Sequence, residues 1–228
     1  MEPIDPKQFI ITRKRKKYKF ALFHNSPLCF EYEQWQNLQG QAPQWWDAGV
    51  IEVGAGNGKF AVELAARHPN QKLVALDVKG DRLQQGARIA EERGLENIRF
   101  VRARADQICE LFAPNSLSAI WVTFADPFPR KRSAGRRMTH PTYLKKYAEL
   151  LCASGSINIK HDNPVFFAWT LEQLVTEGWH IAELSFDLHD SVLDEEYKVM
   201  TSYEARWLSE GRVIQFAKAT PPRTTSGG

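Results

Sequence analysis

One glycine-rich stretch, residues 50–60, constrains this chain more than any other part of its sequence. It reads VIEVGAGNGKF, so a short apolar run breaks into three glycines at alternate positions and a helical pattern follows at once. Glycine at such a turn lets the backbone approach a ligand closely. The pattern predicts a strand, a tight turn and a helix, which together open a nucleotide-type α/β unit.

The spacing of these glycines narrows the choice of ligand. It is G-x-G-x-G rather than the G-x-G-x-x-G of a dinucleotide site, and no G-K-[ST] follows to hold a triphosphate. Glu52 lies in the strand before the turn, and Asp77 ends the next apolar run. An acid at the tip of the second strand can accept both hydroxyls of a ribose. S-adenosylmethionine fits this pattern, because it has a ribose and an adenine but no phosphate.

Composition bounds the class of protein. A length of 228 residues suits one well-filled α/β domain with appendages. No apolar run approaches about 18 residues, and no apolar core follows the charges at the N-terminus, so we expect neither a membrane span nor a secretory signal. The 3 cysteines and 6 histidines show no metal-ligand spacing, so we expect no metal. We predict a cytoplasmic protein, and the sequence leaves its oligomeric state open between a monomer and a homodimer.

The distribution of charge and pattern divides the chain into three segments. Residues 1–27 form a basic arm, which we expect to be disordered and to add non-specific affinity for phosphates. Residues 28–219 are expected to form a single domain, and residues 220–228 a disordered tail.

From residue 50 onward, predicted strands alternate with predicted helices. We expect strands at 50–53, 72–77, 98–102, 118–124, 156–160, 179–186 and 212–219. We expect helices at 58–67, 80–93, 141–151 and 164–177, and shorter ones near 108–112 and 202–209. This alternation predicts an α/β fold with a mostly parallel, doubly wound, seven-stranded sheet. The last two strands lack a full helical crossover and should finish the sheet antiparallel.

An acid stands at or just after the end of most of these strands. Ligands of such sheets bind beyond the carboxyl ends of the strands. Like charges gathered there repel one another unless ligands use them. The acids are Glu52, Asp77, Asp106, Asp126 and Asp162.

A second informative stretch, residues 124–137, reads FADPFPRKRSAGRR. Asp126 is followed by two prolines, which make the loop stiff. Five of the eight residues from 130 to 137 are Lys or Arg. A basic run directly after an acidic loop favours a polyanionic substrate, held by its backbone and presenting a base to the pocket.

Together these stretches resemble the tRNA (guanine-N7-)-methyltransferases of the bacterial single-chain type, over about residues 50–217. The shared motifs are the E-[IV]-G-x-G-x-G turn at 52–58, the F-x-D-P loop with its basic segment at 124–137, an acid-containing box at 161–163 and the T-x-[FY]-E box at 201–204. Three positions depart from the family pattern, where Phe128, Arg130 and His161 stand for Trp, Lys and Thr.

The resemblance implies a Rossmann-like class I S-adenosylmethionine-dependent fold and transfer of a methyl group to N7 of a guanine in tRNA. It assigns cofactor binding to Glu52, Gly54, Gly56, Asp77, Asp106 and Asp126. It assigns substrate binding to Arg130, Asp162, Thr201, Ser202, Tyr203 and Glu204, and RNA contact to Arg132, Arg136 and Arg137.

The chemistry of guanine agrees with this assignment. N7 has a free lone pair and needs no general base, so catalysis can rest on alignment and on carboxylates that stabilise a cationic product. Asp126 and Asp162 are the candidate catalytic residues. N7 of a paired guanine lies in the deep, narrow groove of A-form RNA, so we expect an unstacked guanine as substrate.

Three other interpretations remain open. The Asp126-Pro127-Phe128 loop partly resembles that of methyltransferases acting on exocyclic amino groups. A nicotinamide-dependent oxidoreductase would need the other glycine spacing. A non-catalytic RNA-binding protein on a methyltransferase fold would retain the basic run but should have lost the acids.

Overall fold

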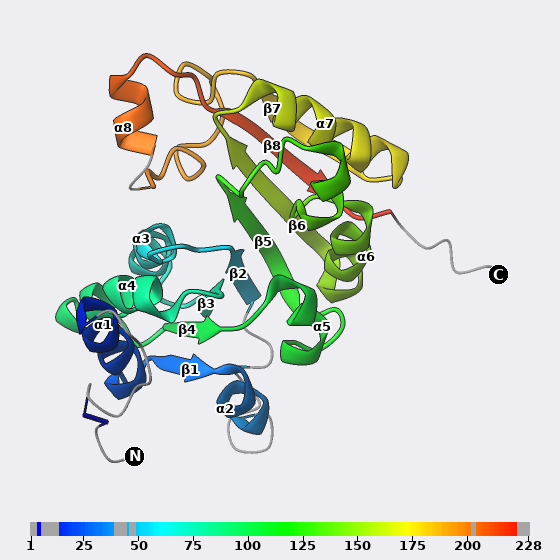
Figure 1. Ribbon diagram of the computed structural model, residues 1–228. Coiled ribbons are helices and arrows are strands. Elements are labelled where there is room, and N and C mark those ends of the chain that lie inside the picture. Colours follow the sequence, from blue (N-terminus) through cyan, green and yellow to red (C-terminus); the bar gives the residue numbers. More distant parts are fainter. Residues whose placement is uncertain (1–3, 6–13, 39–44, 46–48, 202–203, 223–228) are drawn as a thin grey trace. The chain divides into compact units, whose positions relative to one another are not determined.

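The computed structural model describes residues 4–5, 14–38, 45, 49–201 and 204–222. The chain forms two compact units, residues 1–113 and 114–228, each with its own group of strands (Figure 1).

The first unit is built on four parallel strands in the order β1-β4-β3-β2. They are β1 (Cys29–Glu31), β2 (Gly49–Val53), β3 (Leu73–Asp77) and β4 (Ile98–Arg102). Parallel neighbours need crossover connections. Helix α3 (Lys59–Arg67) joins β2 to β3, and helix α4 (Gly80–Glu92) joins β3 to β4. The pairing of Val53 with Leu76 brings the ends of β2 and β3 side by side.

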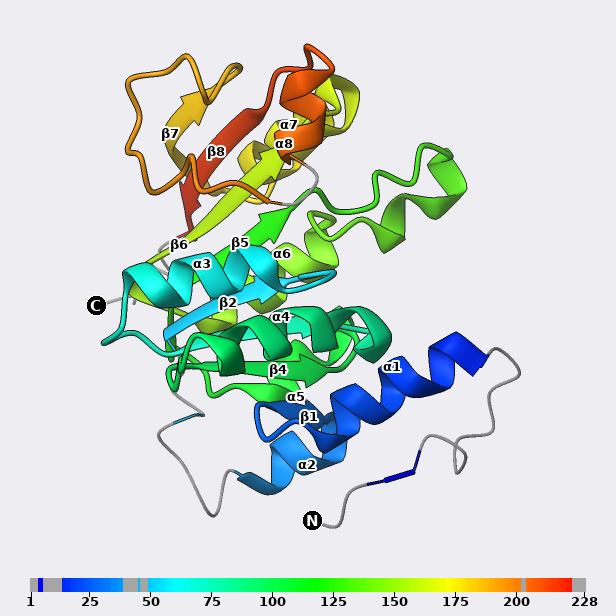
Figure 2. The same cartoon turned by 90° about the vertical axis from the view of Figure 1, so that its left-hand side faces the viewer.

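Two glycines allow α3 and α4 to pack closely over β4 (Figure 2). A Cβ on Gly58 would lie 2.6 Å from Cε1 of Phe100, and a Cβ on Gly86 would lie 2.7 Å from the same atom. On the opposite face, helix α2 (Tyr32–Asn37) packs against α5 (Ile108–Leu111), which follows the short helix η4 (Ala105–Gln107). Trp35 of α2 is buried and donates its indole N–H to the carbonyl oxygen of Leu111 at 2.9 Å.

Of the disordered arm predicted over residues 1–27, residues 1–3 and 6–13 lie outside the described residues, but much of the remainder is helical. Residues Lys14–Asn25 form helix α1, which packs against α4. Ala21 and Phe23 are buried in that region, with 4% and 1% of their surface exposed. The sequence pattern indicated only a charged tail, because lysines and arginines outnumber the apolar residues at the start of this segment.

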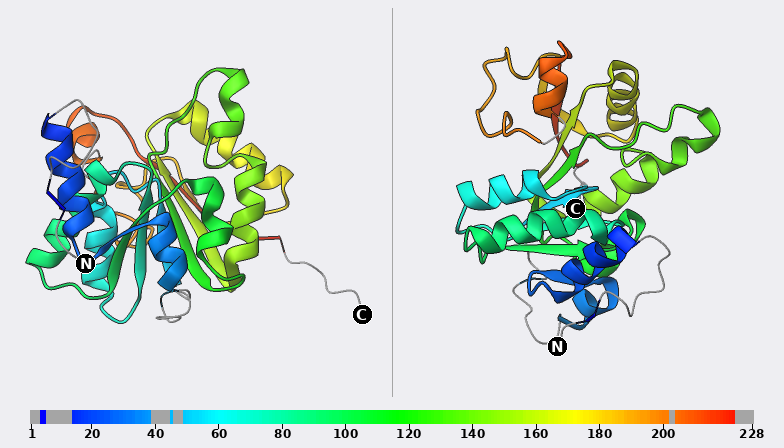
Figure 3. Two further views of the ribbon diagram at one scale, coloured as in Figure 1. Left: turned by 60° about the horizontal axis from the view of Figure 1, so that its bottom comes forward. Right: turned by 60° about the vertical axis from the view of Figure 1, so that its left-hand side comes forward.

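The second unit has four strands in the order β5-β6-β8-β7. They are β5 (Leu117–Thr123), β6 (Leu151–His161), β7 (His180–Ser185) and β8 (Gln215–Thr220). Strands β5 and β6 are parallel, and β8 runs antiparallel to both β6 and β7, as predicted for the end of the sheet. Helices α6 (Pro141–Leu150) and α7 (Pro164–Thr176) pack along these strands (Figure 3).

The alternation of side chains along β6 sends neighbouring residues to opposite sides. His161 contacts Phe166 of α7, with ring centroids 4.4 Å apart. Lys160 points the other way, where its ammonium group meets Glu204 at the start of helix α8 (Glu204–Ser209). The last two residues of β6 therefore serve different neighbours.

Each of the seven strands expected from the sequence is present within a residue or two, except that β6 begins earlier, at Leu151, and β8 begins later, at Gln215. The sequence did not predict β1 or α2, because neither has a clear hydrophobic period. The basic loop contains a 3-10 helix, η5 (Lys131–Arg136). Thr220 ends β8, so it is not part of a tail, and residues 223–228 lie outside the described residues. The single domain over 28–219 stays a prediction.

Candidate active site

The glycine turn after β2 is held by backbone hydrogen bonds to the end of β3. The N–H groups of Gly54 and Ala55 both donate to the carbonyl oxygen of Leu76, at 2.8 and 3.0 Å. Gly54 and Gly56 have φ angles of 77° and 58°, a region that other residues rarely adopt. This conformation brings the turn beside Asp77.

Asp77 is the centre of this turn. Its Oδ2 accepts the N–H of Gly56 at 2.9 Å, and its Oδ1 accepts the N–H of Lys79 at 2.8 Å. Burial raises the pKa of Asp77 above its ordinary value of 3.8, although the two backbone donors oppose the shift. Each carboxylate oxygen has a second lone pair. The carboxylate is therefore fixed in place and can still accept hydrogen bonds from a ligand.

The other two predicted acids of the first unit differ in their surroundings. Glu52 is the fourth residue of β2 and is only 3% exposed. Asp106 lies in η4 and is paired with Arg104, whose Nε lies 2.9 Å from Oδ1. The side chain of Asp106 is 41% exposed, so the pair is accessible to solvent. Solvent access would let Asp106 exchange Arg104 for a ligand donor at little cost.

The turn fits a nucleoside cofactor. Apart from Gly56 and its two chain neighbours, no heavy atom of the described residues lies within 4 Å of a Cβ built on Gly56, so the backbone there is open to close approach. Asp77 beside the turn suits a ribose diol. The turn is not followed by the G-K-[ST] that would hold a triphosphate. S-adenosylmethionine matches this set of groups.

In the second unit, the loop after β5 carries the strained backbone of the site. Phe124 and Phe128 have φ angles of 50° and 39°, which are rare for aromatic residues. Strain of this kind persists only where the surroundings impose it. The N–H of Phe124 donates to the carbonyl oxygen of Lys160 at 2.9 Å, which ties the loop to β6.

Arg137 holds the other end of this loop. Its Nε donates to the carbonyl oxygen of Pro127 at 3.0 Å and its Nη2 to that of Phe128 at 3.1 Å. The guanidinium also lies 4.2 Å from the ring centre of Trp169 on α7. Two of its donors thus bind the protein's own loop, and the RNA-contacting role of Arg137 stays a prediction.

His161 connects the turn after β6 to the loop after β5. Its Nδ1 accepts the N–H of Asn163 at 2.9 Å, so Nε2 must carry the proton that it donates to the carbonyl oxygen of Ala125, also at 2.9 Å. Burial lowers the pKa of His161 below 6.5, while the Ala125 hydrogen bond and the charge of Asp162 oppose the shift. The ring is therefore neutral and its tautomer is set by these two bonds.

The two predicted catalytic acids follow these connected segments. Asp126 is exposed in the loop after β5, next to Ala125. Asp162 follows β6, and its side chain is only 12% exposed and accepts Nη1–H of Arg212 at 3.0 Å. Strands β5 and β6 are parallel and Thr123 pairs with Lys160, so the two acid-bearing turns leave neighbouring strand ends.

The predicted basic residues of the loop, apart from Arg137, are open to solvent. Arg130, Arg132 and Arg136 are all exposed, and the guanidinium of Arg136 lies 4.4 Å from the ring centre of Phe128. Exposed cations on one short loop are suited to contact a polyanion.

Thr201 and Glu204 of the T-x-[FY]-E box lie in a buried polar network, and their substrate-binding role stays a prediction. Glu204 is fully buried and its carboxylate accepts from Lys160 Nζ at 2.6 Å and from the N–H of Thr201 at 2.9 Å. Thr201 Oγ1 accepts the N–H of Glu204 in return, at 3.1 Å. His189 lies 2.8 Å from the same carboxylate. Ser202 and Tyr203 lie outside the described residues.

Sequence reasoning missed three residues that shape this region: Lys160, Trp169 and Arg212. T-x-x-E before a helix is the pattern of a capping box, and this signal was present in the sequence. Lys160 gave no such signal, because it continues the alternation of polar and apolar residues along 156–160, which read SINIK. Nothing in the sequence indicated that Trp169 would lie against Arg137 or that Arg212 would pair with Asp162.

Two further properties bear on the class of protein. Among the described residues, no group of three or more His, Cys, Asp or Glu side chains is arranged to hold a metal ion. None of the helices within the described ranges is long and apolar enough to cross a membrane.

Comparison of the fold finds other methyltransferases. The 16S rRNA methyltransferase KamB superposes with a TM-score of 0.58 at 19% identity, over 85% of this chain and 95% of that one. A 16S rRNA (adenine(1408)-N(1))-methyltransferase from Catenulisporales acidiphilia gives a TM-score of 0.55 at 14% identity, over 86% and 93% of the two chains. The predicted class I, Rossmann-like α/β fold is confirmed, but the predicted number of seven strands was wrong, because the described residues also contain β1.

Comparison of the sequence identifies the family. Residues 47–217 match the family described as "Putative methyltransferase". A tRNA (guanine-N(7)-)-methyltransferase from Brevibacillus brevis is 35% identical over 170 residues, which are 75% of this chain and 79% of the relative. The enzyme of the same name from Cytophaga hutchinsonii is 37% identical over 172 residues, 74% of this chain and 78% of the relative. The chain belongs to the methyltransferase family that these relatives represent.

Proposed function

We propose that this chain transfers a methyl group from S-adenosylmethionine to N7 of a guanine in tRNA, forming 7-methylguanosine. The names of its relatives support this reaction. The observation that carries it is that His161 forms hydrogen bonds with both acid-bearing turns. It donates to Ala125, next to Asp126, and accepts from Asn163, next to Asp162.

The cofactor is assigned to the glycine turn of the first unit. Asp77 binds the ribose hydroxyls with the lone pairs that Gly56 and Lys79 leave open. Glu52 and Asp106 complete the predicted set. S-adenosylmethionine supplies the methyl group on a cationic sulfonium, so a turn with acids and no phosphate cradle is the appropriate partner.

Asp126 and Asp162 act on the guanine. Guanine N7 needs no deprotonation, but the base becomes cationic when it is methylated. Carboxylates fixed beforehand stabilise that charge without reorganising. They also suit the N–H donors on the Watson–Crick edge of guanine. The pair with Arg212 holds Asp162 in place, and the side chain of Arg212 is 51% exposed.

The RNA backbone is assigned to the exposed cations Arg130, Arg132 and Arg136. Arg137 has the separate task of holding the carbonyl groups of Pro127 and Phe128. Phosphate contacts offset the few kcal/mol needed to unstack the guanine. We place the reaction in the cytoplasm, where tRNA substrates are found.

The experiment that tests this function is methyl transfer from labelled S-adenosylmethionine to bulk tRNA, followed by digestion to nucleosides and chromatography. The expected product is 7-methylguanosine. A label on an exocyclic amine, on carbon or on ribose contradicts the proposal even if transfer is efficient.

A further inference from the structure

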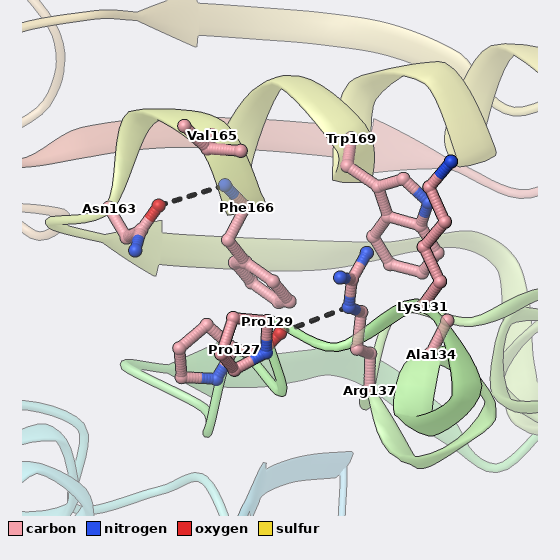
Figure 4. Close-up of a pocket in the computed structure, with 9 residues that line it drawn as sticks. All are labelled: Pro127, Pro129, Lys131, Ala134, Arg137, Asn163, Val165, Phe166 and Trp169. Carbon is pink, nitrogen blue, oxygen red and sulfur yellow. Dashed lines mark hydrogen bonds between the residues drawn. The ribbon is translucent and has the colours of Figure 1, made fainter.

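The second unit contains a pocket that the proposed chemistry does not use. It has a volume of about 630 Å³ and lies between the loop of residues 127–137 and the start of α7 (Figure 4). Small-molecule sites occupy roughly 300–1,000 Å³. Pro127 and Pro129 form one wall, and Phe166 and Trp169 form the other.

Both walls are held in place by contacts within the unit. Arg137 binds the carbonyl oxygen of Pro127 at 3.0 Å and lies 4.2 Å from the ring centre of Trp169, so it joins the two walls. Asn163 caps α7 by accepting the N–H of Phe166 at 3.0 Å. The pocket is therefore preformed, and its ligand does not have to order it.

The charged side chains that line the pocket, Lys131 and Arg137, are both positive. Lys131 lines it and is exposed, and Arg130, Arg132 and Arg136 are exposed on the same loop. Among the described residues that line the pocket there is no acid. The pocket therefore offers no carboxylate to the N–H donors of a guanine edge, as Asp126 and Asp162 do. Its apolar walls and cations suit the flat face of a base with a phosphate beside it.

We propose that this pocket is a second base subsite, which takes an unstacked nucleobase of the substrate RNA next to the methylated guanine. The inference rests on the proposed function. Turning a guanine out of its stack removes the stacking partner of the neighbouring base. Aromatic and guanidinium groups replace that partner without reading the edge of the base, while the cations of η5 hold its phosphates.

The test uses the full chain, and its variants separate the pocket from the fold. Trp169→Ala removes part of one wall, and Trp169→Phe keeps an aromatic ring there. Ala134→Phe fills the pocket from the opposite side and leaves Trp169 in place. Ala168→Phe is the matched control, because Ala168 is an exposed residue of α7 that does not line the pocket.

The probes are an oligouridylate of roughly ten nucleotides and its abasic counterpart, which has the same phosphates without bases. The wild-type chain should prefer the oligouridylate by about 5- to 150-fold, the range expected for one stacked base. Trp169→Ala and Ala134→Phe should lose that preference, and Trp169→Phe should keep most of it. Ala168→Phe should match the wild type.

Equal binding of the two oligonucleotides by the wild-type chain overturns the inference, as does a preference that survives both Trp169→Ala and Ala134→Phe. The wild-type chain could instead show the expected preference for the oligouridylate and yet fail to methylate tRNA. That result contradicts the proposed function and not the inference. The two failures are thus distinguishable.

Discussion

The imidazole Nε2–H of His161 donates to the carbonyl oxygen of Ala125 at 2.9 Å, so the residue before Asp162 holds the residue before Asp126. The family that this chain resembles usually has Thr at position 161. A threonine has no imidazole ring to bridge the carbonyl oxygen of Ala125 and the N–H of Asn163. The bond requires a neutral ring, because Nδ1 must accept the N–H of Asn163. The two proposed catalytic turns are thus linked by a titratable group.

The first prediction concerns this group and pH. Burial lowers the folded-state pKa of His161 below 6.5, so its contribution to stability is fully present above about pH 6.5 and is lost as pH falls through the lowered value. The unfolding free energy of the wild type should therefore fall between pH 7.5 and pH 5. Urea unfolding at both pH values measures this.

His161→Gln should show a weaker dependence on pH and cost about 1–3 kcal/mol at neutral pH, because the N–H of Asn163 and the carbonyl oxygen of Ala125 both lose their imidazole partner. His180→Gln is the control, since His180 is an exposed histidine in β7. If His161→Gln and the wild type lose the same free energy on acidification, His161 is not the titrating group.

The second prediction concerns the cofactor. Asp77→Ala should weaken S-adenosylmethionine binding by roughly 1.5–3 kcal/mol, about 10- to 150-fold, because it removes charged hydrogen bonds to the ribose. Burial raises the pKa of Asp77, so wild-type affinity should decline on acidification while the pH is still above 3.8. Calorimetry at several pH values measures both effects. Glu92→Ala, at the exposed end of α4, should bind normally.

The third prediction separates the arginines of the basic loop. Replacing Arg132 and Arg136 with Ala should reduce the salt dependence of tRNA binding by about 0.7–0.9 in slope for each phosphate that is no longer neutralised. Affinity for S-adenosylmethionine should stay unchanged. Arg88→Ala on α4 provides a control for the removal of one positive charge. A wild-type slope in the double variant would mean that these side chains do not meet RNA phosphates.

Arg137→Ala should behave differently from its neighbours. It removes two hydrogen bonds to carbonyl groups and the guanidinium beside Trp169, so it should lower the free energy of unfolding by roughly 1.5–3 kcal/mol. The salt slope of tRNA binding should change little. Thermal unfolding and a salt titration distinguish these effects, and a stable variant with a reduced slope would support an RNA-contacting role for Arg137.

The last prediction concerns the buried pair of Lys160 and Glu204. Glu204→Ala leaves a fully buried ammonium group without its carboxylate, which should cost about 3–5 kcal/mol of stability. Lys160→Met combined with Glu204→Leu should cost less, because no charge is left buried. Urea unfolding of the two variants measures this difference. A double variant less stable than Glu204→Ala would contradict it.

From residue 50 onward, the sequence by itself determined the order of strands and helices and the position of the glycine turn. Hydrophobic periods and glycine spacing are local signals, so β2, α3 and β3 could be predicted with Asp77 at the end of β3. The acids after β5 and β6 followed from the same reasoning. Helix α1 did not, because its buried face depends on α4 being present.

Only the tertiary structure decided which charged side chains remain available to a ligand. Arg137 and Arg132 look alike in the sequence, yet one binds loop carbonyl groups and the other is exposed. Glu204 pairs with a lysine from a strand 44 residues away, and His161 bonds to a carbonyl 36 residues away. Such interactions join segments that are distant in the chain. A local pattern of residues cannot predict them, because the partners come together only when the backbone has folded.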